Sequence, residues 1–241
     1  PAVIWIQTAI TFVAFVILFM APGNEMRVAS EITTWMPGYK ELSVGKHLFM
    51  TIQWMLSSFA NEGKAFFIAI WTAGFLLLMK SKKAKVYQIL AVVFSVVALL
   101  PYAGISFFSE MGIGYIDIEQ RLTELPTWQT MTTQNRIAFF WWIAAVLFTM
   151  VLLWKVTGHS VFISMVFLGG IASEAVLHFS PTIYASGARV YYLTDLMYLF
   201  IILWMVMHMD SEKKKNLFIA GVVVLGVANF LSQYSIMLLK L

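Results

Sequence analysis

Residues 137–154 read IAFFWWIAAVLFTMVLLW, a run of eighteen residues without a charged side chain. A helix that crosses the hydrocarbon core of a bilayer needs about 20 mainly apolar residues, within a range of about 17 to 25. This stretch is therefore predicted to span a membrane. Six further segments are also mainly apolar and are predicted to be spans: Ala2–Met20, Lys64–Met79, Val86–Phe108, Val161–Phe179, Tyr191–Met209 and Leu217–Leu239.

The segment Lys64–Met79 is the least regular of these candidates. Its uncharged core is short, although Lys64 and Lys80 could extend their ammonium groups outward from its two ends. The preceding stretch His47–Ala60 is also apolar but is interrupted by polar side chains. We expect there a surface or re-entrant helix, or a tilted helix continuous with the second span.

The composition excludes a soluble protein. Of the 241 residues, 61% are hydrophobic and 12% are charged, and the mean hydropathy is +0.82, whereas soluble domains are about half apolar and about a quarter charged. The chain has no cysteine, which excludes disulfides and thiolate metal sites, and its dispersed net charge of +4 does not indicate nucleic acid as a partner. We predict one all-α polytopic transmembrane domain over residues 1–241, with about seven spans in contact with membrane lipids. Because it begins with Pro1, it could be a fragment of a longer chain.

Lysine and arginine indicate how the spans are oriented. The short loops Lys80–Lys85, Lys155–His159 and Asp210–Lys215 hold eight of the sixteen Lys and Arg residues, and they fall on one side if the spans alternate. Short basic loops face the cytoplasm. The amino terminus is therefore predicted to be cytoplasmic. The long loops, which we expect to carry the function, are then extracytoplasmic: Ala21–Gly63, Ser109–Arg136 and Ser180–Val190.

The first of these loops opens with the sequence APGNEMR, Ala21–Arg27. A Pro-Gly pair is enough to stop a helix, so Asn24 and Arg27 invite a further interpretation. One interpretation is an interfacial arginine in contact with lipid phosphates. The other is a binding site in which Arg27 grips a phosphate through two hydrogen bonds while Asn24 orients a hydroxyl or a loop carbonyl.

A second group of candidates begins near the outer end of the fifth predicted span. Glu174 and His178 are four residues apart, so they share one face of a helix. An ionisable residue inside a span is costly and by default marks function, with a partner expected. Glu174 is predicted to be a catalytic base, or a ligand of a divalent cation, with His178 beside it; the alternative is a structural Glu–His pair. The sequence shows no third metal ligand at a diagnostic spacing.

The loop after this span adds Tyr184 and Arg189 as candidates for substrate binding. Gly187 would let a phosphate approach the backbone N–H groups closely. Arg189 can also be interpreted as an interfacial anchor beside two tyrosines. If Arg27 and Arg189 meet on the outer side, the two guanidinium groups could hold one lipid phosphate or diphosphate.

Two motifs together resemble a known family. The motif APGN-x-x-R at Ala21–Arg27, followed by S-P-T-x-Y-x-S-G-x-R-V-Y-Y at Ser180–Tyr192, resembles a family of bacterial polytopic membrane proteins. That family is similar to GT-C-type glycosyltransferases and to the Gtr-type proteins that decorate surface polysaccharides. The resemblance implies an inner-membrane protein that uses a polyprenyl-phosphate sugar on the extracytoplasmic face. GT-C members usually carry an essential acid in the first outer loop. Here that loop offers Glu25, Glu31, Glu41 and Glu62, none in an acidic pair.

The expected function is transfer of a sugar from a polyprenyl-phosphate donor to a cell-envelope glycan. Arg27 and Arg189 would hold the donor phosphate, which gains charge as the glycosidic bond breaks. Glu174, or an acid of the first outer loop, would deprotonate the acceptor hydroxyl. Two other classes remain: a transporter or flippase for a lipid-linked or small anionic substrate, and a noncatalytic membrane subunit with a protein partner. The transporter would need an inner gate, of which the short basic loops give little sign.

Overall fold

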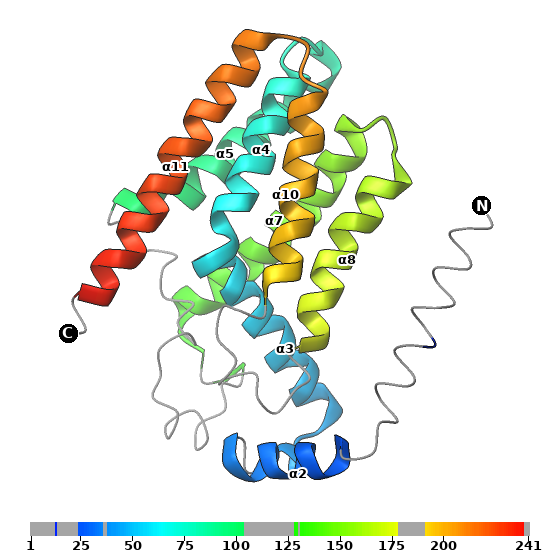
Figure 1. The fold of residues 1–241 in the computed structure, drawn as a ribbon, viewed down its shortest axis with the longest axis vertical. Helices are drawn as coiled ribbons and strands as arrows, with labels where there is room; N and C mark the ends of the chain where they lie inside the picture. The colour runs from blue at the N-terminus through cyan, green and yellow to red at the C-terminus, as the bar shows by residue number, and fades with distance from the viewer. Residues whose placement is uncertain are drawn as a thin grey trace.

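The computed structural model describes residues 13, 24–35, 38–103, 128–129, 131–177 and 191–238 (Figure 1). Every regular element in this part of the chain is helical, which confirms the predicted all-α class. In chain order the elements are α2 (Asn24–Trp35), η1 (Tyr39–Glu41), α3 (Val44–Ser58), η2 (Phe59–Gly63), α4 (Lys64–Leu78), η3 (Lys82–Ala84), α5 (Lys85–Leu99), η4 (Leu100–Ala103), α7 (Thr133–Val156), α8 (Val161–Leu177), α10 (Tyr192–Met207) and α11 (Glu212–Leu238).

The elements α3, η2 and α4 follow one another without a break and form one long helix (Figure 1). Ser43 caps its start, because the Ser43 Oγ accepts a hydrogen bond from the backbone N–H of Lys46 at 3.3 Å. The element η2 is a π turn, a wider turn that often occurs at functional sites. Of the alternatives for His47–Ala60, a helix continuous with the second predicted span is the one confirmed.

The central helix of the bundle is α4, which contacts α5, α7, α10 and α11. Its side chains are apolar around most of its circumference, as expected for a helix without a solvent face. Phe67, Ile70 and Trp71 are all fully buried. The indole Nε1 of Trp71 donates a hydrogen bond to Oγ1 of Thr149 in α7 at 2.7 Å, so the buried N–H has a partner.

Two glycines allow neighbouring helices to approach closely. A Cβ atom on Gly74 of α4 would lie 2.7 Å from Leu152 Cδ2 of α7. A Cβ atom on Gly170 of α8 would lie 3.1 Å from the ring of Tyr198 in α10. A larger residue at either position would require the side chain of Leu152 or of Tyr198 to shift.

The bundle has two ends of different chemistry. The loops Lys80–Lys85, Lys155–His159 and Asp210–Lys215 lie together at the upper end in Figure 1, and we name this the basic end. At the opposite end α3 extends beyond the other helices, and α2 lies across its tip (Figure 1). We name this the acidic end, for the carboxyl groups described below.

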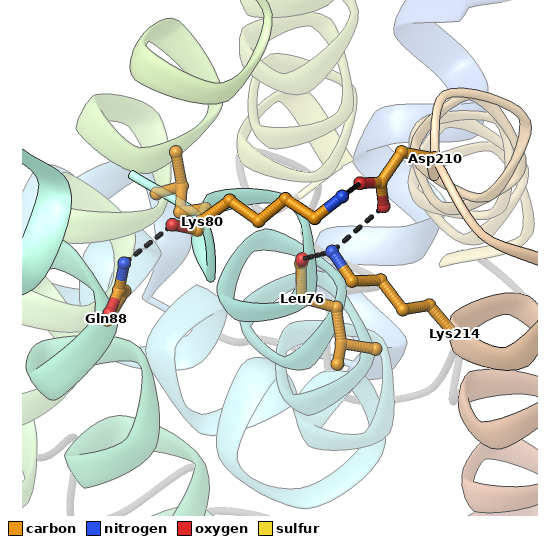
Figure 2. Close-up of polar contacts among 6 residues, drawn as sticks. Leu76, Lys80, Gln88, Asp210 and Lys214 are labelled. Carbon is orange, nitrogen blue, oxygen red and sulfur yellow. Dashed lines mark hydrogen bonds and ion pairs between the residues drawn. The ribbon is translucent and has the colours of Figure 1, made fainter. Parts of the chain in front are cut away.

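Polar contacts tie the basic end together (Figure 2). The carboxylate of Asp210 accepts hydrogen bonds from Nζ of Lys80 at 2.6 Å and from Nζ of Lys214 at 2.9 Å. Lys214 also donates to the backbone carbonyl of Leu76 at 2.8 Å. The side-chain amide of Gln88 in α5 donates to the backbone carbonyl of Leu78 at 2.6 Å, so it joins α5 to the end of α4.

Two helices of the described part are long and apolar enough to cross a membrane: Lys82–Tyr102 and Thr133–Val156. Shorter apolar helices cover Val161–Val176 and Tyr192–Met207. These two are shorter than the usual length of a span. The predicted first span, Ala2–Met20, lies almost wholly outside the described residues. The predicted bundle of about seven spans is therefore supported for two helices and otherwise stays a prediction.

Candidate functional site

Three carboxyl groups from three different helical elements meet at the acidic end. Glu62 of the π turn η2, Glu174 of α8 and Asp195 in the first turn of α10 line one small cavity. The cavity has a volume of about 10 Å³, which is enough for about one water molecule. We name these three residues the carboxyl cluster.

Glu174 is the buried floor of the carboxyl cluster, with 1% of the residue exposed. The hydroxyl of Ser58 in α3 donates a hydrogen bond to Oε1 of Glu174. The same Ser58 Oγ lies 2.8 Å from the backbone carbonyl of Met55. Because a hydroxyl has one hydrogen, it serves one of these two acceptors at a time. When its hydroxyl binds Glu174, Ser58 joins α3 to α8.

Exposure rises across the carboxyl cluster towards Glu62. Asp195 is half-buried, and Glu62 reaches the surface. The protein nevertheless removes part of the water around Glu62. This burial, together with the negative charge of Asp195, raises the pKa of the Glu62 carboxyl above its usual value. One carboxyl of the cluster thus opens to the surface, with the other two behind it.

Tyr198 contributes a buried hydroxyl to the same cavity. The residue is 1% exposed, and its Oη has no hydrogen-bond partner among the described residues. A buried polar group without a partner costs about 1–3 kcal/mol. Packing alone does not explain this hydroxyl, because a phenylalanine would fill the same space. Its place beside three carboxyl groups indicates a polar site rather than a sealed core.

Hydrogen bonds between helices fix the start of α10, which carries Asp195. The indole Nε1 of Trp54 in α3 donates to Oη of Tyr191 at 2.9 Å. The hydroxyl of Thr194 donates to the backbone carbonyl of Gly170 in α8 at 3.1 Å. The carboxyl of Asp195 is therefore presented by a helix start that is bound to both α3 and α8.

An aromatic layer closes the cavity on the side of the basic end. It consists of Phe59, Phe67, Phe167 and Tyr198, each at most 1% exposed. Their ring centroids lie 5.1 to 6.5 Å apart, so the rings contact one another closely. Two of these rings, those of Phe59 and Tyr198, also line the cavity of the carboxyl cluster.

Among the predicted site residues, Glu174 is the one whose side chain is described. Among the described residues its carboxyl accepts a hydrogen bond from Ser58 and lines the cavity with Glu62 and Asp195. The predicted residues His178, Tyr184 and Arg189 lie outside the described residues.

Asn24 and Arg27 form the first turn of α2, so the chain is already helical at the end of the APGNEMR motif. The side chains of both residues lie outside the described part, and their predicted role in phosphate binding stays a prediction. Nor do the described residues contain a group of three or more His, Cys, Asp or Glu side chains that could hold a metal ion. A divalent cation as cofactor stays a prediction from the sequence.

The other two members of the carboxyl cluster also carry a signal in the sequence. Asp195 lies inside an apolar segment, which is the same signal that singled out Glu174. Glu62 lies four residues after Ser58, so the two share one side of a helix. Only the fold, however, distinguishes Glu62 from the other acids of its loop. The unpartnered Tyr198 hydroxyl has no counterpart in the sequence pattern.

Comparison with known proteins provides no further guide to this site. No protein-family model, no curated protein and no solved structure matches the chain.

Proposed function

We propose that the protein is a membrane-embedded transferase that moves a sugar from a polyprenyl-phosphate donor to a hydroxyl of a cell-envelope glycan. The observation that carries the proposal is the carboxyl cluster, in which three acids converge and one of them reaches the surface. Acids in apolar surroundings are costly and are retained where they do chemistry. Transfer to a hydroxyl requires a group that accepts its proton, and a carboxylate can do so.

In this proposal the chain is a polytopic protein of the bacterial inner membrane. The basic end faces the cytoplasm, in agreement with the distribution of lysines, and the acidic end faces outward. The helix α2, which lies across the acidic end (Figure 1), is then at the level of the lipid headgroups. Its first turn carries Asn24 and Arg27, which with Tyr184 and Arg189 remain the predicted ligands of the donor phosphate.

Glu62 is the proposed base because it is the most exposed member of the carboxyl cluster. The acceptor oxygen attacks the anomeric carbon of the donor, and the bond from that carbon to the phosphate oxygen breaks. The bonding electron pair leaves with the lipid phosphate, and the hydroxyl proton passes to the Glu62 carboxylate. A raised pKa brings this carboxyl closer to neutral pH, where proton transfer is most effective.

Glu174 takes a supporting place in the proposal. It is too buried to meet a sugar directly, because 1% of the residue is exposed and the cavity has the room of about one water. With Asp195 it sets the charge around Glu62, and we treat it as a positioning residue. The base is then an acid of the first outer loop, which is the second of the two options that the sequence left open.

The transporter alternative requires a path to the basic end. The buried aromatic layer lies behind the carboxyl cluster, and the ion pairs of Asp210 join α4 to α11 at the basic end. These contacts favour a site that works from one side. The alternative of a noncatalytic subunit has no specific support among the described residues.

The test is a transfer assay with the full chain in proteoliposomes that contain an undecaprenyl-phosphate sugar. Glu62→Gln keeps the size of the side chain but cannot accept the proton, so the rate should fall by about 100-fold or more. The matched control is Glu41→Gln, which changes an exposed acid on η1 outside the cavity. It should leave the rate unchanged. The acid limb of the pH–rate profile should lie above the usual pKa of a glutamate.

Transfer at the parental rate by Glu62→Gln would remove Glu62 from the mechanism. Movement of the lipid across the bilayer without release of sugar would instead support the transporter.

A further inference from the structure

Lysines without an acidic partner gather at one connection of the basic end. The segment Lys80–Lys85 between α4 and α5 holds four lysines and no acid. Lys80 is paired with Asp210 (Figure 2). The other three lysines are exposed, and no acid of the described residues forms an ion pair with them. We name them the lysine patch: Lys82, Lys83 and Lys85.

The positive charge of this end is not balanced by its own acids. Its three loops hold eight lysines and two acids, which gives a formal charge of +6, whereas the whole chain carries +4. Both acids are already bonded to lysines: Asp210 to Lys80 and Lys214, and Glu212 to Lys215. Clusters of four or more basic residues directly beside a membrane-crossing helix are typical of binding sites for anionic lipid headgroups.

Hydrogen bonds fix the backbone that carries the lysine patch. The side-chain amide of Gln88 donates to the backbone carbonyls of Leu78 at 2.6 Å and of Ser81 at 3.1 Å. The N–H of Ser81 donates to the carbonyl of Leu78 at 2.8 Å, and the N–H of Ala84 donates to the carbonyl of Ser81 at 3.0 Å. A ligand of the patch therefore binds a connection that is already ordered, which removes one cost of binding.

An exposed apolar stripe continues from the lysine patch along α5. Ile89, Val92 and Val96 follow Lys85 at intervals of four, three and four residues, so they share one face of the helix with it. Their side chains are 55%, 44% and 51% exposed. The helix Lys82–Tyr102, which contains α5, is also the less buried of the two that are long enough to cross a membrane. Cations above an apolar stripe match an amphipathic ligand with an anionic head.

We propose that the lysine patch and the apolar stripe of α5 bind an anionic phospholipid of the cytoplasmic leaflet. Its phosphate lies at the patch, where each ammonium group offers three donors, and an acyl chain lies along the stripe. The stripe decides between a lipid and a free anion or an acidic protein, since neither of these needs an apolar surface below the lysines. The proposal rests on the placement of the chain in a membrane, which belongs to the proposed function, but not on sugar transfer or on the carboxyl cluster.

The lysine patch is tested by native mass spectrometry of the full chain in detergent, titrated with phosphatidylglycerol or with phosphatidylcholine of the same acyl chains. The parent should bind phosphatidylglycerol at least about tenfold more tightly. Lys82→Gln/Lys83→Gln should lose about tenfold or more of this affinity, because each lysine near an anionic surface contributes about fivefold. The matched control, Lys40→Gln/Lys46→Gln, removes two exposed lysines at the acidic end and should bind like the parent.

The apolar stripe is tested separately. Val92→Asn places a polar side chain against the acyl chain and should weaken phosphatidylglycerol binding by about fivefold. Val151→Asn, at a valine of similar exposure on α7, should not. Glycerol phosphate, which has the phosphate without acyl chains, should bind the parent at least about tenfold more weakly than phosphatidylglycerol, and inorganic phosphate should not displace the lipid at equal concentration.

Equal binding of the two phospholipids would overturn the proposal, as would equal losses in the two double lysine variants. Displacement of the lipid by inorganic phosphate would instead assign the patch to a free anion. An acidic protein that copurifies with the parent but not with Lys82→Gln/Lys83→Gln, without any change in lipid binding, would assign it to a protein partner. Glu62→Gln should bind phosphatidylglycerol like the parent, so a failure of the transfer assay leaves the lipid measurement intact, and the reverse also holds.

Discussion

The charged side chains at the two ends of the bundle differ in the partners that they have. At the basic end, Asp210 lies between Lys80 and Lys214, and Lys214 also caps a carbonyl of α4 (Figure 2). At the acidic end, Glu62 and Lys64 have no ion-pair partner among the described residues, although they belong to the same helix turn. Paired charges stabilise a connection between helices, whereas unpaired ones remain ready for a ligand.

This difference distinguishes polar groups that stabilise the fold from polar groups that are available to a ligand. A buried polar group with a complete set of partners is explained by folding alone. The hydroxyl of Tyr198, the indole of Trp142 and the ammonium of Lys64 are not explained in this way. Tyr198 lines the cavity of the carboxyl cluster, whereas Lys64 and Trp142 line a separate small cavity.

Phe67→Ala is the substitution with the largest expected effect, because it removes one ring from the buried aromatic layer. The ring is fully buried and contacts Phe59, Phe167 and Tyr198. Loss of a buried phenylalanine ring costs about 3–5 kcal/mol. The free energy of unfolding, measured by SDS titration in mixed micelles, should fall by this amount.

Phe140→Ala is the matched control, since Phe140 is 59% exposed on α7. It should change the free energy of unfolding by about 0.5 kcal/mol at most. Equal losses in the two variants would show that the layer is not the barrier we describe. In proteoliposomes, Phe67→Ala should retain sugar transfer per folded molecule if the site works from one side.

Tyr198→Phe tests the acidic end itself and should have the opposite sign. Removal of a buried hydroxyl without a partner should stabilise the protein by about 1 kcal/mol or more. The rate of transfer should fall at the same time, because the hydroxyl belongs to the cavity of the carboxyl cluster. Unfolding free energies and transfer rates of the same preparations decide both points.

The control for this substitution is Tyr192→Phe, in which an exposed hydroxyl is removed one turn and a half away on α10. It should leave both quantities unchanged. A loss of stability in Tyr198→Phe would mean that the hydroxyl is bonded in the folded protein, for example to a water in the cavity. The functional interpretation of Tyr198 would then fail.

The sequence predicted the helical class and the position of most helices, because long apolar runs such as Ile137–Trp154 have only one local solution in a bilayer. It also predicted that the three basic loops would share one side, as they do (Figure 1). It did not decide how His47–Ala60 joins the second span. That junction is a π turn, and three of its residues line the cavity of the carboxyl cluster together with residues of α8 and α10.

The sequence identified one residue of the candidate site, but it did not show which residues the fold brings together around it. Glu174 was identifiable because an acid within an apolar helix is costly wherever the helix goes. Its partner could not be identified, because Ser58 lies 116 residues away in the chain. Glu62 likewise depends on the packing of α3 and α4 against α8 and α10. Residues that are far apart in the chain come together here through the packing of the helices, and the spacing of residues along the sequence does not predict that packing.

Asp210→Asn tests the basic end and should have the smallest effect. Hydrogen bonds from Lys80 and Lys214 lower the pKa of Asp210 to about 2. A carboxyl whose pKa is lower in the folded than in the unfolded state stabilises the fold above the unfolded value of about 4, and this contribution disappears as the pH falls through about 2. The parent should therefore melt slightly above Asp210→Asn at pH 7, and the difference should vanish between pH values of about 4 and 2.

Glu212→Gln provides the control, because Glu212 pairs at the surface with Lys215 of its own helix, a contact that does not join α4 to α11. Its melting temperature should follow that of the parent at both pH values. The Asp210 pairs are exposed to solvent, so added salt should also shrink the difference between Asp210→Asn and the parent. If the difference instead persisted at low pH and high salt, Asp210 would act through packing rather than charge. The contrast between the ion pairs of the basic end and the exposed carboxyl of Glu62 at the acidic end would then lose its electrostatic basis.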